Sequence, residues 1–203
     1  MHTMKTLAVY CGAANGVNPV HADAARQLAR AMVEHNINLV YGGGKVGLMG
    51  VIADEVLRLG GEATGVIPRA LVEREVGHAG LTRLFVVKDM HERKAMMADL
   101  SEGFIAMPGG MGPLEELFEM VTWAQLGIHA KPIGLLNVNG FYDGLRAVVG
   151  HQVAEGFVRP EHEGLMIAES DPDTLIHRLS AAAPAPAVQA AVEADAEARG
   201  LRG

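Results

Sequence analysis

Residues 38–59, NLVYGGGKVGLMGVIADEVLRL, place a glycine-rich loop between a short apolar run and a segment with helical periodicity. The run Asn38–Tyr41 predicts a buried strand, and Leu48–Leu59 predicts a helix. Strand, loop and helix in this order form the repeating unit of a parallel sheet. Because glycine has no Cβ atom, it lets backbone N–H groups approach an anion closely. The stretch therefore favours an α/β protein with a ligand site at the carboxyl end of a strand.

The same alternation continues through most of the chain and predicts a mostly parallel sheet of about seven strands, covered by helices on both faces. The other predicted strands are Thr6–Tyr10, Ala63–Ile67, Leu84–Val87, Phe104–Met107, Ile133–Leu136 and Leu165–Ala168. The other predicted helices are His21–His35, Met90–Leu100, Leu114–Leu126, Tyr142–Glu155 and Pro172–Leu179.

A change in composition near Ala181 marks the end of this pattern. The remaining sequence is rich in alanine and glutamate, is broken by prolines and has few large apolar residues. We expect residues 1–182 to form a single domain and residues 183–203 to form a flexible C-terminal tail.

Composition excludes several classes of protein. A net charge of −7, with no basic cluster longer than two residues, argues against a nucleic-acid-binding surface. No apolar run approaches the roughly 20 residues that span a bilayer. The single cysteine, Cys11, excludes an internal disulfide and is typical of a reducing cytoplasm. The histidines lack the spacing of metal ligands, so we expect no catalytic metal.

A second glycine loop, residues 107–116 (MPGGMGPLEE), also follows a predicted strand. One such loop could be only a tight turn with close helix packing. Two loops at equivalent strand ends favour a phosphate site, because each following helix directs the positive end of its dipole there. The spacing Gly42-x-Gly44-x-x-Gly47 matches a dinucleotide fingerprint, but the loop follows the second strand, and Glu62 precedes its strand instead of ending it. A nicotinamide site is therefore disfavoured.

Charged side chains lie beside both loops. Asp89 is a candidate N-cap with Glu92 three residues later, which places Arg93 about one turn into its helix. Arg93 could be a surface arginine, although its helix face is otherwise apolar. Glu115 and Glu116 lie in the first turn after the second loop, where the helix dipole favours acids and should keep Glu116 ionised.

The segments YGGGKVGLMG, DMHERKAMM and PGGMGPLEELFEMVTWAQLGIHAKPIGLLNVNGFYDGL strongly resemble the Lonely Guy (LOG) family of cytokinin-activating phosphoribohydrolases, from about Lys5 to Ala168. The resemblance implies a Rossmann-like three-layer sandwich that needs no cofactor. It implies a hydrolase that converts N6-modified adenosine 5′-monophosphates to the free base and ribose 5-phosphate. It also implies a homodimer or larger homo-oligomer, for which Trp123, Leu126 and Ile128 are candidate contact residues.

By the same resemblance, Arg93 and Glu116 are the catalytic residues. An ionised Glu116 would stabilise positive charge on the ribose, and Arg93, which keeps its proton, would act by charge and position. The residues expected to bind substrate are Gly42, Gly43, Gly44, Gly47, Glu75, Lys94, Gly109, Gly110, Met111, Gly112, Pro113, Leu114, Glu115 and Thr122.

Two positions depart from the family pattern. Pro113 stands where the family motif has threonine, and Ala13-Ala14 stand where it has two serines. Pro113 removes a hydroxyl and a backbone N–H from the expected phosphate cradle, although proline suits the first turn of a helix. The alternative to an enzyme is therefore a nucleotide- or cofactor-binding carrier on the same fold, like the molybdenum-cofactor carriers. A further alternative is hydrolysis of unmodified nucleotides or of ribosides.

Overall fold

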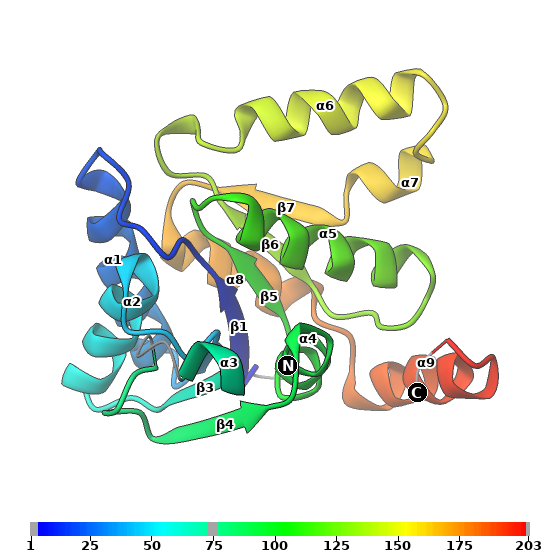
Figure 1. Cartoon of the computed structure of the whole chain (residues 1–203). Coiled ribbons are helices and arrows are strands. Elements are labelled where there is room, and N and C mark those ends of the chain that lie inside the picture. The colour runs from blue at the N-terminus through cyan, green and yellow to red at the C-terminus, as the bar shows by residue number, and fades with distance from the viewer. Residues whose placement is uncertain (1–3, 73–76, 202–203) are drawn as a thin grey trace.

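The computed structural model describes residues 4–72 and 77–201. Its seven strands form one parallel sheet in the order β4-β3-β2-β1-β5-β6-β7 (Figure 1). The strands are β1 (Thr6–Tyr10), β2 (Asn38–Tyr41), β3 (Ala63–Pro68), β4 (Arg83–Val87), β5 (Phe104–Ala106), β6 (Ile133–Leu136) and β7 (Met166–Glu169). The predicted strands are confirmed, each to within one residue at either end.

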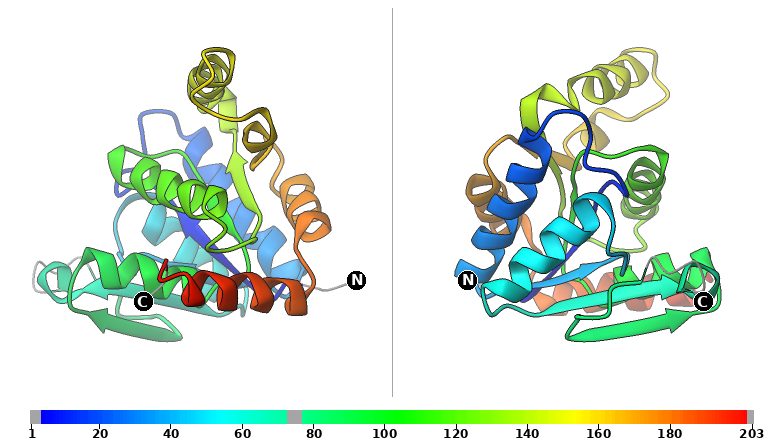
Figure 2. Two further views of the ribbon diagram at one scale, coloured as in Figure 1. Left: turned by 90° about the vertical axis from the view of Figure 1, so that its right-hand side faces the viewer. Right: turned by 60° about the vertical axis from the view of Figure 1, so that its left-hand side comes forward.

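Helices cover both faces of the sheet, so the three-layer prediction is also confirmed (Figure 2). The long helices are α1 (Val20–Glu34), α2 (Gly47–Arg58), α4 (Met90–Asp99), α5 (Met111–Gln125), α6 (Asp143–Ala154), α8 (Pro172–Ala182) and α9 (Pro186–Ala198). Three short helical turns complete them: α3 (Arg69–Val72), η1 (Val138–Gly140) and α7 (Pro160–Glu163). None of the described helices is long and apolar enough to cross a membrane.

The central strand β1 shows how the layers are built, since its side chains alternate between two apolar clusters. Leu7 and Val9 pack in the cluster that holds α1, α2 and α8. Ala8 and Tyr10 pack in the cluster that holds α4 and α5. A strand buried on both faces has no polar side to expose, which explains its continuous apolar sequence.

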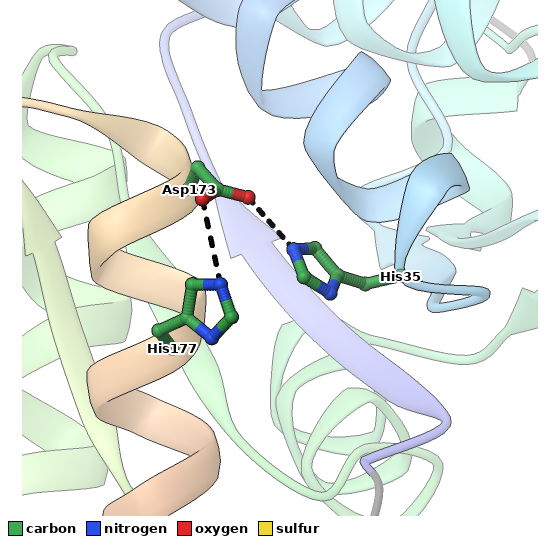
Figure 3. A group of neighbouring side chains, drawn as sticks. All are labelled: His35, Asp173 and His177. Carbon is green, nitrogen blue, oxygen red and sulfur yellow. Dashed lines mark hydrogen bonds and ion pairs between the residues drawn. The ribbon is translucent and has the colours of Figure 1, made fainter.

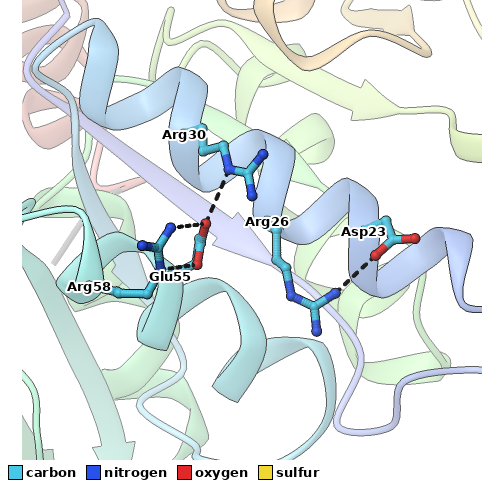
Figure 4. A network of polar contacts seen from close by, with 5 residues as sticks. All are labelled: Asp23, Arg26, Arg30, Glu55 and Arg58. Atoms are coloured by element: carbon cyan, nitrogen blue, oxygen red, sulfur yellow. Dashed lines mark hydrogen bonds and ion pairs between the residues drawn. The ribbon is translucent and has the colours of Figure 1, made fainter.

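Besides apolar packing, polar contacts join α1 to its neighbours α2 and α8. The buried Glu55 of α2 accepts two hydrogen bonds of 2.8 Å from Arg58 and one of 3.2 Å from Arg30 of α1 (Figure 4). The hydrogen bonds from Arg58 are the main reason that the pKa of Glu55 falls to about 2. These contacts fix the position of α1 against α2.

A second polar group joins α1 to α8. Asp173 contacts His35 at 2.7 Å through one carboxylate oxygen and His177 at 3.5 Å through the other (Figure 3). Such a trio could ligate a metal ion, because its three ligand atoms lie within 4.8 Å of one another. The spacing of histidines in the sequence did not indicate this group, because His35 follows α1 whereas Asp173 and His177 lie in α8. In this structure each of the two histidines contacts one of the two carboxylate oxygens of Asp173.

Two parts of the chain extend beyond this compact body. Helix α6 stands away from the sheet in Figure 1, and its one buried residue is Val149. The predicted domain limit coincides with the end of α8, and α9 follows it. In α9, Gln189 accepts a hydrogen bond of 2.9 Å from the Ala130 N–H, and Glu193 lies 3.4 Å from Lys131. The flexibility of residues 183–203 stays a prediction.

Candidate functional site

The strand order reverses between β1 and β5, because the chain leaves β1 towards β2 and leaves β5 towards β6. At such a switch point the loops after the two strands diverge and leave a crevice at the carboxyl edge of the sheet. A cavity of about 470 Å³ lies there. Residues 12–16, after β1, and 108–110, after β5, line it together with His21, Leu48 and Phe141.

The glycines of these loops allow a packing that side chains would prevent. A Cβ atom on Gly47 would lie 2.3 Å from the backbone carbon of Ala13, and the residue has a φ of +59°. A Cβ atom on Gly12 would lie 3.2 Å from the Cα atom of Gly109. The three loops that follow β1, β2 and β5 therefore meet through backbone atoms, while the use of the glycines to bind an anion stays a prediction.

The helices that begin at this edge direct uncapped backbone N–H groups towards it. Helix α5 has Gly110 as its N-cap and α2 has Val46, and no described side chain caps either. The first four N–H groups of a helix have no partner within it. In α2 the Leu48 N–H already donates to the Gly12 carbonyl at 3.0 Å, so a bound anion would mainly satisfy the N–H groups at the start of α5. Helix α5 begins at Met111, three residues earlier than predicted. Pro113, which is buried, therefore lies within the first turn of the helix and does not precede it.

Arg93 of α4 and Glu116 of α5 form the charged pair of the site. Arg93 Nη2 lies 3.4 Å from Glu116 Oε1, and both side chains are about nine-tenths buried. The helix start predicted for Arg93 is confirmed, because Asp89 accepts hydrogen bonds of 3.0 Å from the N–H groups of His91 and Glu92. Among residues 4–72 and 77–201, the buried Nε atom of Arg93 has no hydrogen-bond partner. The structure thus brings together the two residues that the sequence identified as catalytic.

Burial changes the protonation of Glu116. It raises the pKa of this carboxyl group to about 7, although the charge of Arg93 acts in the opposite direction. The helix terminus, which was expected to favour ionised Glu116, therefore does not decide its protonation. Loss of water around a carboxylate outweighs the favourable helix terminus at this position.

The loop after β2 lies directly beneath Arg93. A Cβ atom on Gly42 would be 1.9 Å from Arg93 Nη2 and 3.3 Å from the sulfur of Met49. The guanidinium of Arg93 thus packs directly against Gly42, in space that any side chain would fill. This role of Gly42 is distinct from binding an anion through its N–H group.

Lys94 and Glu115 form a separate ion pair. The buried Lys94 amine binds Glu115 and also lies 3.1 Å from Glu119. Although burial favours the neutral amine, the two carboxylates raise the pKa of Lys94. Both charges of the expected substrate-binding pair, Lys94 and Glu115, are therefore partly neutralised within the subunit.

The remaining predicted site residues are placed as follows. Met111 and Gly112 are exposed at the start of α5, while Leu114 is half-buried. Thr122 is exposed on α5, about 9 Å along the helix from Glu116 at 1.5 Å per residue, so the structure does not bring it to the pair. Glu75 lies outside the described residues. The chain just after it returns to the first glycine loop, where the His78 N–H donates to the Gly43 carbonyl at 2.9 Å.

Three aromatic residues near the site were not predicted from the sequence. His21 and Phe141 both line the cavity. The hydroxyl of Tyr142 donates a hydrogen bond of 2.6 Å to the Met107 carbonyl at the start of the second glycine loop. These residues come from segments more than 100 positions apart, and no local motif connects them.

Comparison with known proteins places these observations in a family. A family model described as "Possible lysine decarboxylase" matches residues 49–179. The chain is 46% identical over 180 residues to "Probable cytokinin riboside 5'-monophosphate phosphoribohydrolase LOGL9" from Oryza sativa, covering 89% of this chain and 79% of that protein. It is 45% identical over 175 residues to cytokinin riboside 5'-monophosphate phosphoribohydrolase LOG7 from Arabidopsis thaliana, covering 86% and 81%.

Solved structures share the fold at much lower identity. The molybdenum cofactor carrier protein from Chlamydomonas reinhardtii superimposes with a TM-score of 0.65 at 19% identity, covering 88% of this chain and 97% of that one. The molybdenum cofactor binding protein from Rippkaea orientalis gives 0.65 at 18% identity, covering 87% and 96%. At this identity the likeness shows the fold alone.

Proposed function

Because this chain belongs to the LOG family of cytokinin riboside 5′-monophosphate phosphoribohydrolases, we propose that it hydrolyses the N-glycosidic bond of N6-modified adenosine 5′-monophosphates. The products are the free base and ribose 5-phosphate, and the reaction needs water but no redox or group-transfer cofactor. The observation that carries the proposal is the buried pair of Arg93 and Glu116, set beside two glycine loops at the switch point of the sheet.

The pair suits the charge changes of this reaction. The bond between ribose C1′ and the base nitrogen breaks, its electrons leave with the base, and positive charge develops on the ribose. The ionised carboxylate of Glu116 stabilises that charge and orients the water that adds to C1′. Arg93 keeps its proton at any physiological pH, so it acts by holding Glu116 and the substrate in place.

The glycine loops supply the proposed substrate contacts. We propose that backbone N–H groups around the start of α5, between Gly109 and Leu114 but not at Pro113, hold the 5′-phosphate. Gly42, Gly43, Gly44 and Gly47 give the substrate close access on the other side. Glu75, Lys94 and Thr122 complete the proposed set of substrate-binding residues. Of these, Thr122 would have to contact the substrate at a distance from Arg93 and Glu116.

The site argues against the decarboxylase description of the family model. Decarboxylation of an amino acid normally uses a lysine that forms a Schiff base with a pyridoxal cofactor. Such a lysine must lose its proton before it attacks a carbonyl group. The two carboxylates beside Lys94 favour its charged form. Lys94 is therefore poorly suited to that chemistry.

The direct test is incubation with isopentenyladenosine 5′-monophosphate, AMP and isopentenyladenosine, followed by chromatography of the released bases. We expect isopentenyladenine to appear from the monophosphate faster than adenine from AMP, and little base from the riboside. Tight binding of a nucleotide without any release of base would instead support a carrier, which the missing hydroxyl at Pro113 favours.

We propose that the protein works in the cytoplasm as a homodimer or larger homo-oligomer. Large apolar side chains are exposed on α5 and just after it, at Met111, Phe118 and Leu126. Exposed apolar side chains that gather on one helix favour a protein interface. Of the residues predicted for this contact, Leu126 is 48% exposed, but Ile128 is buried within the subunit. Its assignment to the interface was wrong, because it packs in the monomer core.

Light scattering at micromolar concentration should therefore give at least twice the subunit mass of 21.5 kDa. Replacing Phe118 with aspartate should shift the mass towards that of one subunit, because a charge would be buried in the contact. The matched change Val17→Asp, at a fully exposed site in the loop before α1, should leave the mass unchanged. A wild-type monomer would contradict the assembly proposal.

The departure at Pro113 gives a prediction about phosphate binding. Pro113→Thr returns a backbone N–H to the first turn of α5, where it needs no partner within the helix. It also returns a hydroxyl. The KM for the monophosphate should fall by about tenfold, because each hydrogen bond to a charged group adds binding energy. The kinetics of the riboside should not change. An equal effect on both substrates would place the phosphate elsewhere.

A further inference from the structure

The cavity between the loops that follow β1 and β5 is lined mainly by glycine, alanine and apolar side chains and lies at the starts of two helices. None of the residues that line it is acidic, and His21 is the one lining residue whose side chain titrates. Backbone atoms of residues 12–16 and 108–110 form much of the wall, and α1 and α5, each of 15 residues, begin beside it. Their positive ends favour negative charge at this position.

His21 is held in the wall of this cavity from two sides. Its ring packs against Gly16, where an added Cβ atom would lie 3.0 Å from the ring and where the φ of +75° favours glycine. The ring of Phe141 meets it edge-on at a centroid distance of 5.9 Å. His21 is the second residue of α1, so its backbone is also fixed. The side chain is therefore positioned before any ligand arrives.

The polar atoms of this imidazole are not fully used within the subunit. Its Nδ1 atom is buried and has no hydrogen-bond partner in the part of the chain that the structure describes. A buried ring nitrogen without a partner carries a free-energy cost, and its burial leaves Nε2 as the ring nitrogen available to a ligand in the cavity. By contrast, His35, His78 and His129 all have hydrogen-bond partners.

We propose that His21 binds the 5′-phosphate of the substrate and sets the preference for monophosphates over ribosides. The inference rests on the proposed function and assigns one more residue to its phosphate site. An imidazole N–H donated to a phosphate oxygen would replace the contacts that Pro113 and the two alanines after Gly12 cannot make. The unusual loop sequence would then be compensated by a side chain from another element, the first turn of α1.

The test compares His21→Phe, which keeps an aromatic ring but has no donor, with His21→Gln, which keeps a donor. For His21→Phe, the KM of the monophosphate should rise about tenfold to a hundredfold with kcat within a few-fold of wild type. His21→Gln should recover part of the loss. The kcat/KM for the riboside should stay unchanged in both. The control is His151→Phe, which changes an exposed histidine in α6.

Binding measurements separate this inference from the proposed function. Calorimetry with AMP and with ribose 5-phosphate should show weaker binding to His21→Phe, whether or not any base is released. Unchanged affinity in His21→Phe would overturn the role of His21 even in an active enzyme. Equal losses on the monophosphate and the riboside would also overturn it, since they indicate a general structural effect. If the wild type binds AMP but releases no base, the hydrolase proposal fails and the His21 proposal stands.

Discussion

Replacing Glu116 with glutamine should lower turnover of the monophosphate at least about 100-fold, since the amide cannot supply the negative charge that stabilises a cationic ribose. The buried position should accept the change without loss of the fold, because glutamine has the same shape as glutamate. Glutamine also carries no charge, so it avoids the free-energy cost of burying an ionised carboxylate. Circular dichroism should match the wild type. Near-normal rates in a folded variant would remove Glu116 from the mechanism.

The raised pKa of Glu116 adds a pH signature to this result. If the ionised form is the active one, kcat/KM should fall as the pH drops below about 7 and level off above it. The carboxylate would otherwise have an ordinary pKa near 4.3, and activity would persist into mild acid. In Glu116→Gln the residual activity should lose this rise. A wild-type profile that is flat from pH 5 to pH 8 would show that the ionised form is not required.

Replacing Gly42 with alanine should reduce turnover nearly as much as replacing Arg93, about 100-fold, although Gly42 carries no functional group. The new methyl group would occupy the space of Arg93 Nη2, only 1.9 Å away. Because the end of a flexible side chain can move aside, the fold should survive while the guanidinium leaves Glu116. The double variant Gly42→Ala/Arg93→Ala should be little worse than either single one, since both remove the same interaction.

The matched control is Gly144→Ala in α6, where an added Cβ atom meets nothing within 4 Å. It should keep full activity and gain slightly in stability, because alanine is the better helix former. If Gly42→Ala kept wild-type rates while Arg93→Ala lost them, the guanidinium would not depend on this position. Additive losses in the double variant would give Gly42 a second role, such as direct contact with substrate.

Local patterns were enough to predict the sheet, and they placed both glycine loops at its carboxyl edge. Each parallel strand is a short apolar run between turn residues, so its limits are visible in the sequence. The start of α5 was placed three residues late, because glycines and a proline usually precede a helix and here lie within its first turn. Strand ends placed Arg93 and Glu116 at the same edge of the sheet, and the resemblance to the LOG family identified them as a catalytic pair.

What the sequence could not supply depends on distant contacts. The pKa of Glu116 reflects the volume of side chains packed around it, which no local motif encodes. The ring of His21 reaches the cavity only because Phe141, 120 positions later, packs against it. The contacts of α9 depend on Lys131, whose amine donates to the Ala98 carbonyl at 2.9 Å while facing Glu193.

The position of β1 in the sheet also affects how the chain is made. On one side β1 pairs with β2, which follows closely, but on the other Ala8 pairs with Phe104. During synthesis this second edge stays open until about a hundred residues have left the ribosome, and an open apolar edge attracts other strands. Non-local pairing of this kind also slows folding. A chain that stops before β5 would therefore carry an unpaired edge in the middle of its future sheet and would be prone to aggregate.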